Sequence, residues 1–133
     1  MAVSEVSLRI QTHGMCEQET GTWSYEIQYR GTEGDLEQIS AKRGSAEGTT
    51  ARQMQLMAIL NSLSEAKSLD MGVPMILESD CEWCIKCITR EYDCVSDDEH
   101  RRNKVDRGYV QYLQEIWWKI SGIDVTFVAR PGR

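Results

Sequence analysis

Hydrophobic and polar residues alternate in consecutive segments at the start of the chain. The stretch VSLRIQ at residues 6–11 has the two-residue period of a strand with one buried face, and it is predicted to end at residues 12–14, Thr-His-Gly. TWSYEIQYR at 22–30 alternates more clearly, and LEQISAKR at 36–43 less regularly. Because the links between these three strands are short, we expect an antiparallel meander.

The period then changes to that of a helix. GSAEGTT at residues 44–50 is predicted to break the third strand, and a helix is predicted to follow it up to Leu69. Thr50 suits the N-cap position, and Gln53, three residues later, completes a capping-box pattern. The apolar positions that return at helical spacing are Met54, Met57, Ala58, Leu60 and Leu63.

The second half of the chain alternates between strands and helices. The predicted elements are a short apolar strand at 74–80, a helix at 81–92, a charged link at 93–108, an amphipathic helix at 109–121 and a strand at 123–130. The order is therefore β-β-β-α-β-α-α-β, which predicts an α/β fold with a mixed five-stranded sheet and helices packed on it. We expect residues 1–133 to form a single domain.

This order and several local motifs resemble the type I ribonuclease H family. IQTHGMC is similar to the family's first-strand motif T-D-G-S, and GTWSYEIQYRG to its glycine-led second strand. TTARQMQLMAIL is similar to the helix pattern T-x-x-R/Q-M-E-L-x-A, and ILESDC to the fourth-strand motif that ends in T/S-D-S. YVQYLQEIWWKISGIDVTFVARPG resembles the last helix and last strand. The resemblance spans nearly the whole chain and implies a ribonuclease H-like fold.

The resemblance also implies a chemistry that can be compared residue by residue. The family hydrolyses the RNA strand of an RNA–DNA hybrid with two metal ions, which several carboxylates hold and neutralise. The first-strand aspartate aligns with His13 and the helix glutamate with Gln55, whereas the fourth-strand aspartate is present as Asp80. The family's final aspartate and its loop histidine have no equivalent before Arg133.

One carboxylate has too little charge to hold two dications, so the alignment predicts that two-metal hydrolysis is lost. The chain would then be a binding module for nucleic acid, such as an RNA–DNA hybrid, or for a protein partner, without a cofactor. The alternative is an active ribonuclease H with an altered metal site and Mg²⁺ or Mn²⁺. Glu78, two residues before Asp80 on the same side of the strand, would then be the second candidate metal ligand.

Charge is unevenly distributed along the chain. The formal net charge is −6, with 8 Lys+Arg against 18 Asp+Glu in residues 1–100 and 7 against 3 in residues 101–133. An acidic protein is a poor general binder of phosphate backbones, so contact with nucleic acid would use the basic C-terminal quarter.

A basic segment at residues 100–107 is the first candidate for that contact. In the resembled family some members carry a basic protrusion here, and the side chains that would neutralise phosphates are Arg101, Arg102 and Lys104. The acidic residues 97–99 just before them leave open a self-compensating charged loop, in which His100 is solvated. By family position Trp83 would lie near the substrate groove, where it would contact nucleic acid by stacking on bases. An exposed Trp117-Trp118 pair would instead indicate a protein-binding face.

Cys81, Cys84 and Cys87 have C-x₂-C-x₂-C spacing, with Cys94 further on. This spacing permits an iron–sulfur or zinc site, but three thiolates on one regular helix do not converge easily, so buried thiols are favoured. The odd total of five cysteines indicates reduced thiols. No segment has the length of a membrane span or the pattern of a signal peptide, and we expect a cytoplasmic location.

Overall fold

The computed structural model describes residues 6–92 and 107–130, which form a mixed five-stranded sheet with helices. In chain order the elements are β1 (Ser7–Glu17), β2 (Thr20–Arg30), β3 (Leu36–Glu47), α1 (Ala51–Leu69), β4 (Met75–Ser79), α2 (Glu82–Ile88), α3 (Arg107–Ile120) and β5 (Val125–Ala129). The predicted α/β class and the predicted order of elements are confirmed.

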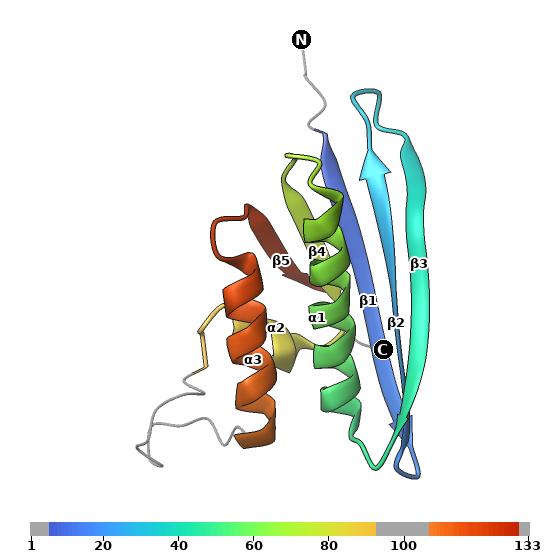
Figure 1. Cartoon of the computed structure of the whole chain (residues 1–133), viewed down its shortest axis with the longest axis vertical. Coiled ribbons are helices and arrows are strands. Elements are labelled where there is room, and N and C mark those ends of the chain that lie inside the picture. The colour runs from blue at the N-terminus through green and yellow to red at the C-terminus, as the bar shows by residue number, and fades with distance from the viewer. Residues whose placement is uncertain (1–5, 93–106, 131–133) are drawn as a thin grey trace.

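The strands lie in the order β3-β2-β1-β4-β5 (Figure 1). β1 pairs antiparallel with β2, and β2 with β3, as the short links between them require. β4 pairs parallel with both β1 and β5. The sequence reaches these parallel positions through helices, because a parallel neighbour cannot be reached by a tight turn.

The hairpin of β1 and β2 is longer than the sequence pattern predicted. β1 does not end at residues 12–14 but continues to Glu17, and β3 is not broken at Gly44 but continues to Glu47. Residues 14–17 and 44–47 both pair with the first four residues of β2, so each extension is stabilised by the other. Gly44 lies so close to the Trp23 ring that a Cβ atom would approach it to 2.5 Å. The glycine that looked like a strand break is therefore a packing position.

α1 begins as predicted, with a different role for one side chain. Thr50 is the N-cap, and its Oγ1 accepts the backbone N–H of Gln53 at 3.2 Å. The reciprocal bond of a capping box is absent among the described contacts, because the Gln53 amide donates to the Tyr112 hydroxyl on α3 at 3.0 Å. Met57 and Leu60, predicted on the buried stripe of the helix, are only half-buried.

α2 is shorter than the predicted helix at 81–92. It begins after Cys81, whose thiol is its N-cap, and ends at Ile88. Arg90 adopts the left-handed conformation with φ of 66°, so the right-handed helix does not continue.

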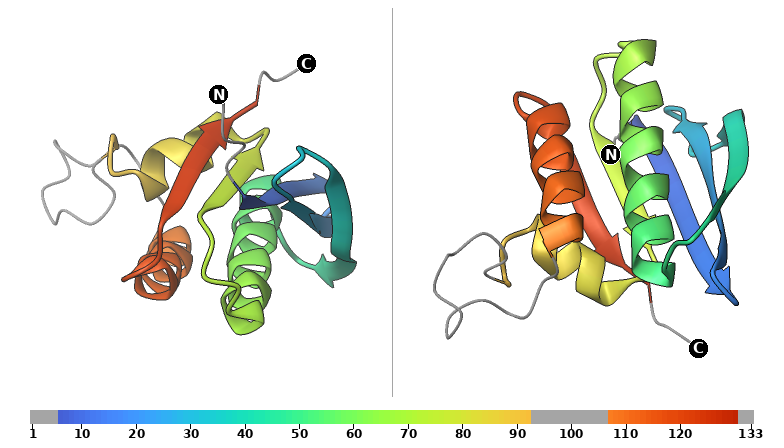
Figure 2. Two further views of the ribbon diagram at one scale, coloured as in Figure 1. Left: turned by 90° about the horizontal axis from the view of Figure 1, so that it is seen from above. Right: turned by 60° about the horizontal axis from the view of Figure 1, so that its bottom comes forward.

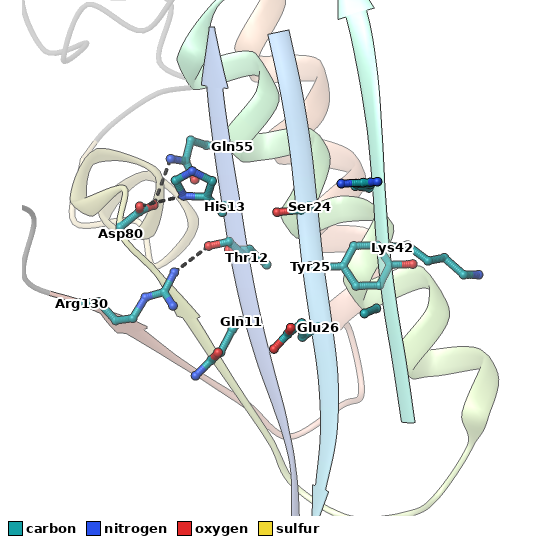
Figure 3. A pocket seen from close by; sticks show the side chains of 12 residues that line it. Gln11, Thr12, His13, Ser24, Tyr25, Glu26, Lys42, Gln55, Asp80 and Arg130 are labelled. Carbon is teal, nitrogen blue, oxygen red and sulfur yellow. Dashed lines mark hydrogen bonds and ion pairs between the residues drawn. The ribbon is translucent and has the colours of Figure 1, made fainter. Parts of the chain in front are cut away.

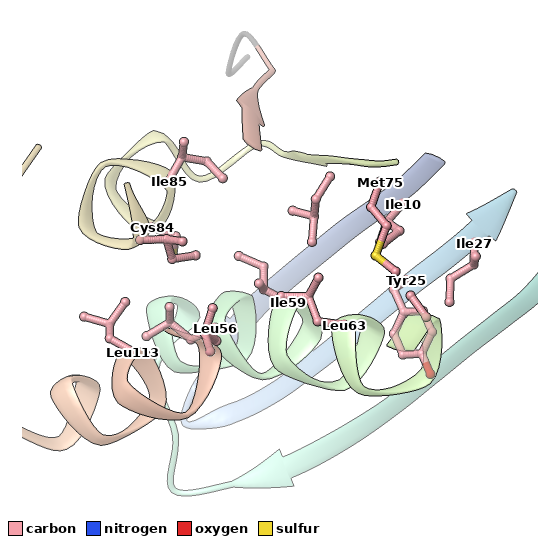
Figure 4. Packing of buried hydrophobic residues seen from close by; sticks show 14 of the residues in the cluster. Ile10, Tyr25, Ile27, Leu56, Ile59, Leu63, Met75, Cys84, Ile85 and Leu113 are labelled. Carbon is pink, nitrogen blue, oxygen red and sulfur yellow. The ribbon is translucent and has the colours of Figure 1, made fainter. Parts of the chain in front are cut away.

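The core lies between the sheet and the two longer helices. Figure 2 shows α1 and α3 on one face of the sheet, where the two helices contact each other. Figure 4 shows side chains of both helices and of the inner strands meeting there. The largest fully buried apolar side chains are Leu8, Ile10, Ile27, Met54, Leu56, Ile59, Leu63, Leu77, Leu113 and Ile116. In the part of the chain that the structure describes, no helix is long and apolar enough to span a membrane.

Candidate functional site

Three side chains from distant parts of the sequence meet beside the end of β4. His13 lies on β1, Gln55 on the second turn of α1, and Asp80 directly after β4. His13 Nδ1 lies 3.0 Å from Asp80 Oδ2, and Gln55 Nε2 lies 3.0 Å from Asp80 Oδ1 (Figure 3). These are the three positions that the sequence motifs aligned, so the structure places them in one cluster, which we call the Asp80 cluster.

Gly14 allows α1 to approach β1 at this point. A Cβ atom on Gly14 would lie 2.5 Å from the backbone nitrogen of Gln55, closer than side chains are found in real structures. The same approach lets Gln55 Nε2 donate to the Gly14 carbonyl oxygen at 2.9 Å. Gly14, which the sequence pattern placed at a strand end, therefore sets the distance between α1 and β1 at the site.

The orientation of the Gln55 amide follows from its neighbours. The Gly14 carbonyl and the Asp80 carboxylate are both acceptors, so the group between them has to be a donor. Gln55 Oε1 then points away, and it is buried without a hydrogen-bond partner among the described residues. The amide N–H₂ thus bridges two oxygen atoms that would otherwise repel each other.

The Asp80 cluster does not fit a pair of magnesium ions. Mg²⁺ binds hard oxygen ligands, and two adjacent dications need several carboxylates, whereas only one of these three side chains is a carboxylate. Both oxygen atoms of that carboxylate already have nitrogen partners. In residues 6–92 and 107–130 no group of three or more His, Cys, Asp or Glu side chains is arranged to hold a metal ion.

The remaining chemistry of the cluster is that of an imidazole paired with a carboxylate. The His13 side chain is 53% exposed and the Asp80 side chain 32% exposed, so solvent reaches the pair. The carboxylate fixes the orientation of the ring, the geometry that general bases use. Among the described residues, no serine or cysteine side chain is hydrogen-bonded to His13, and solvent water is the group that reaches the pair.

A shallow depression of about 1140 Å³ extends from the Asp80 cluster across the sheet toward β3 (Figure 3). Three cationic side chains line it that the sequence analysis did not single out: Lys42, Arg43 and Arg130. Lys42 pairs with Glu65, and Arg130 donates to the Thr12 carbonyl oxygen at 2.6 Å. Strand register places Arg43, Ser24 and His13 side by side across three strands. The sequence pattern did not give this register, so it could not place Arg43 near His13.

Glu78 and Trp83, two further candidates from the sequence, have partners outside the Asp80 cluster. The Glu78 carboxylate pairs with the Arg9 guanidinium on β1. The Trp83 ring lies under the Arg52 guanidinium, 4.3 Å from the ring centroid, and meets Tyr109 edge-on. Their roles as metal ligand and nucleic-acid contact stay predictions. The predicted phosphate contacts Arg101, Arg102 and Lys104, together with His100 and Cys94, lie outside the described residues.

The remaining tryptophans differ from each other. Trp117 packs against the core and donates from Nε1 to the Ile88 carbonyl oxygen at 2.8 Å. Trp118 is 72% exposed, so the two do not form a joint exposed pair.

Comparison with solved structures identifies the fold. RNase H1 from the archaeon Halobacterium salinarum NRC-1 has a TM-score of 0.68 at 13% sequence identity, over 94% of this chain and 86% of that chain. LC11-RNase H1, isolated from compost by a metagenomic approach, has a TM-score of 0.71 at 13% identity, over 94% and 84%. A second structure of LC11-RNase H1 is a complex with an RNA/DNA hybrid.

LC9-RNase H1, a type 1 RNase H with the type 2 active-site motif, has a TM-score of 0.75 at 15% identity, over 100% of this chain and 66% of that chain. No protein-family model and no curated protein matches the sequence. At these identities the structural likeness shows the fold, so the chain has the ribonuclease H-like fold that its motifs predicted.

Proposed function

We propose that this ribonuclease H-like domain binds nucleic acid, an RNA–DNA hybrid or a similar duplex, and has lost two-metal hydrolysis. The observation that carries the proposal is the Asp80 cluster itself. Its single carboxylate is bonded on one oxygen by the neutral amide of Gln55 and on the other by the imidazole of His13. Amide hydrogens occupy the place between Asp80 and the Gly14 carbonyl where a cation would satisfy the same oxygen atoms.

Electrostatics favours loss of hydrolysis over a rearranged metal site. Two divalent ions a few ångströms apart repel each other strongly unless anionic ligands surround them. Replacing one family carboxylate by an amide and another by an imidazole removes two negative charges from the cluster. A neutral imidazole is also a borderline ligand that suits Zn²⁺ or Fe²⁺ better than Mg²⁺.

Two observations support nucleic acid rather than protein as the ligand. The LC11-RNase H1 structure with an RNA/DNA hybrid shows that a protein of this fold binds such a duplex. In this chain Lys42, Arg43 and Arg130 line the depression beside the Asp80 cluster, although the protein as a whole is acidic. Among the described residues Arg43 has no ion-pair partner, so it is available to a phosphate.

Binding and cleavage can be measured in one experiment with labelled RNA–DNA hybrid, duplex DNA and single strands at two salt concentrations. We expect salt-dependent affinity for hybrid and no cleavage with Mg²⁺ or Mn²⁺. Arg43→Gln, Arg101→Gln and Arg102→Gln are each expected to reduce the salt slope by about one. Lys67→Gln is the matched control, because Lys67 lies beside Trp118, away from the depression.

Two outcomes would contradict the proposal. No affinity for any nucleic acid would point to the protein-binding alternative. Robust cleavage that Asp80→Asn abolishes would support an active enzyme with an altered metal site. That second candidate is favoured by the presence of Asp80 and by the match to LC9-RNase H1, a type 1 enzyme with a different active-site motif.

Restoring the missing carboxylates tests the electrostatic argument directly. In the double variant His13→Asp with Gln55→Glu, we expect Mn²⁺ to raise the unfolding free energy by about 2.7 kcal/mol at a hundred times its Kd. The wild type is expected to show no such stabilisation. Gln55→Glu alone places a carboxylate against Asp80 and the Gly14 carbonyl, so it should destabilise the metal-free protein. Equal Mn²⁺ stabilisation of wild type and double variant would refute the argument.

A further inference from the structure

Two cysteines at the junction of β4 and α2 are not used by the proposed function. Cys81 follows Asp80, and Cys84 lies three residues later in the first turn of α2. The backbone N–H of Cys84 donates to Cys81 Sγ at 3.3 Å, and each thiol shifts the pKa of the other. The spacing therefore brings the two side chains into contact.

The two thiols differ in their access to solvent. Cys81 is partly exposed, whereas Cys84 is fully buried. Thiol–disulfide exchange needs an accessible attacking sulfur, and Cys81 is the one of the two that solvent reaches.

The surroundings of Cys81 favour its thiolate form. Interaction with Cys84 and with the nearby Arg52 guanidinium lowers the pKa of the Cys81 thiol, against the opposing effects of its partial burial and of the Asp80 charge. The bond to Cys81, together with burial, raises the pKa of the Cys84 thiol. Solvent access alone makes Cys81 the thiol that an incoming disulfide reaches, and the direction of the two pKa shifts agrees with it.

The other described cysteines lack this arrangement. Cys16 lies on β1 and donates to the Thr49 carbonyl oxygen at 3.3 Å, away from the junction. Cys87 lies one turn after Cys84 and is buried like it. An oxidant from solvent therefore reaches neither sulfur of the pair Cys84 and Cys87. No disulfide joins any of the four described cysteines.

We propose that Cys81 and Cys84 form a reversible dithiol–disulfide couple, with Cys81 as the attacking thiol and Cys84 as the resolving thiol. The oxidant is a small disulfide, RSSR. The Cys81 thiolate attacks one sulfur, forms the mixed disulfide and releases RS⁻, which takes up a proton. The Cys84 thiol loses its proton, its thiolate attacks the Cys81 sulfur and forms the intramolecular disulfide, and the RS⁻ that leaves takes up a proton to give the second RSH. Overall, two protein thiols and RSSR give one protein disulfide and two RSH.

The proposal is independent of whether the domain binds nucleic acid, and it places the couple directly beside the Asp80 cluster. Asp80 directly precedes Cys81, and the backbone N–H of Cys81 donates to Ser79 Oγ at 3.0 Å. Cys81 is therefore hydrogen-bonded to the last residue of β4, and a disulfide at Cys81 forms next to that bond.

The test equilibrates the full chain in glutathione buffers of increasing oxidised fraction, alkylates the remaining thiols and maps disulfides by peptide mass spectrometry. We expect the wild type to form the Cys81–Cys84 disulfide and to lose it again in reduced glutathione. Cys84→Ser is expected to hold one glutathione on Cys81. In the reduced protein we expect Cys81 to alkylate at least about tenfold faster than Cys84. Cys16→Ser is the matched control and should behave as the wild type.

Because Cys84 is fully buried, the Cys84→Ser variant could fail to fold, and Cys84→Ala is then used in its place. The disulfide map of the wild type needs no variant. Three results would overturn the proposal. They are a wild type that stays reduced in buffers that oxidise a control dithiol, a wild type that keeps glutathione on Cys81 without closing the disulfide, and a disulfide that joins Cys81 to another cysteine such as Cys94.

Discussion

The two faces of β1 differ in what determines their side chains. On the face covered by α1 lie Leu8, Ile10 and Thr12, which are almost fully buried. On the opposite face, which we call the open face, lie Arg9 and His13, each in contact with a carboxylate on β4 or directly after it. The covered face follows from alternation alone, whereas the open face is defined by partners that come from 60 to 70 residues away. The comparison predicts different responses to mutation.

The largest effect is expected on the covered face. Ile10 is fully buried between the sheet and α1, so Ile10→Ala leaves a cavity and should lower the unfolding free energy by about 2–5 kcal/mol. Gln11, the next residue of the same strand, points to the open face, and Gln11→Ala should change it by less than about 0.5 kcal/mol. Chemical denaturation of the two variants measures the contrast, and equal losses would refute the assignment of the faces.

Gly14 is where the covered face reaches the functional site. A methyl group there meets the α1 backbone at Gln55, so Gly14→Ala should cost about 1–3 kcal/mol and displace Gln55 from Asp80. Gly31 is the matched control, because its Cβ would meet nothing closer than 3.7 Å. Chemical denaturation gives the unfolding free energy, and the NMR amide signals of wild type and variant show whether Gln55 has moved. If Gly14→Ala leaves the unfolding free energy unchanged, α1 can move away from β1 without a loss of stability, and this prediction is wrong.

A hydrogen bond at the rim of the covered face gives a smaller effect. The Tyr25 hydroxyl donates to Glu65 on α1 at 2.6 Å, so Tyr25→Phe should cost about 1.5 kcal/mol at neutral pH. Tyr29→Phe, on the same strand, is the control, because no hydrogen bond of its hydroxyl is found in the described part of the chain.

The Tyr25 contribution should also depend on pH. Burial opposes ionisation of Glu65, but the bonds from Tyr25, Ser40 and Lys42 lower the pKa of Glu65 below its ordinary value of 4.5. A carboxyl with a lowered pKa in the folded state stabilises the fold above the unfolded pKa, and this contribution is lost as the pH falls through the folded pKa. The difference between wild type and Tyr25→Phe should therefore be full above pH 4.5 and shrink below it. A difference that grows in acid would contradict this sign.

The sequence predicted the fold because the fold rests on periodicity. Two-residue alternation located the strands and helical spacing located α1, since each pattern reports burial on one side of an element. The prediction failed at Gly44, because a glycine that packs under Trp23 looks the same in the sequence as one that turns the chain. It also set the end of β1 too early, because pairing with β2 extends the strand past Gly14.

The candidate site was predicted only as far as motifs could align it. His13, Gln55 and Asp80 were found, since each occupies a motif position, and the structure brings them together. Arg43 was not found, because its neighbourhood depends on the register of three strands. The partner of Glu78 was also hidden, because alternation predicts the side of the sheet but not which charge lies opposite.

The smallest effect is expected from the pair of Arg9 and Glu78 on the open face. The two side chains are 28% and 14% exposed, so their attraction is partly screened by water. In a double-mutant cycle with Arg9→Gln and Glu78→Gln, we expect a coupling of about 0.5–1 kcal/mol that decreases in high salt.

Manganese makes the same cycle a test of the site. If Glu78 stays on Arg9, Mn²⁺ at a concentration that saturates a carboxylate metal site leaves the coupling unchanged, because the ion has no reason to take the carboxylate from its partner. If Glu78 serves with Asp80 as a metal ligand, Mn²⁺ removes the carboxylate from Arg9 and the coupling falls toward zero. Asp80→Asn is the control that separates the cases, since it would restore the coupling only when both carboxylates hold the ion. An unchanged coupling leaves Asp80 as the one carboxylate available at the cluster, the condition under which paired dications are not retained.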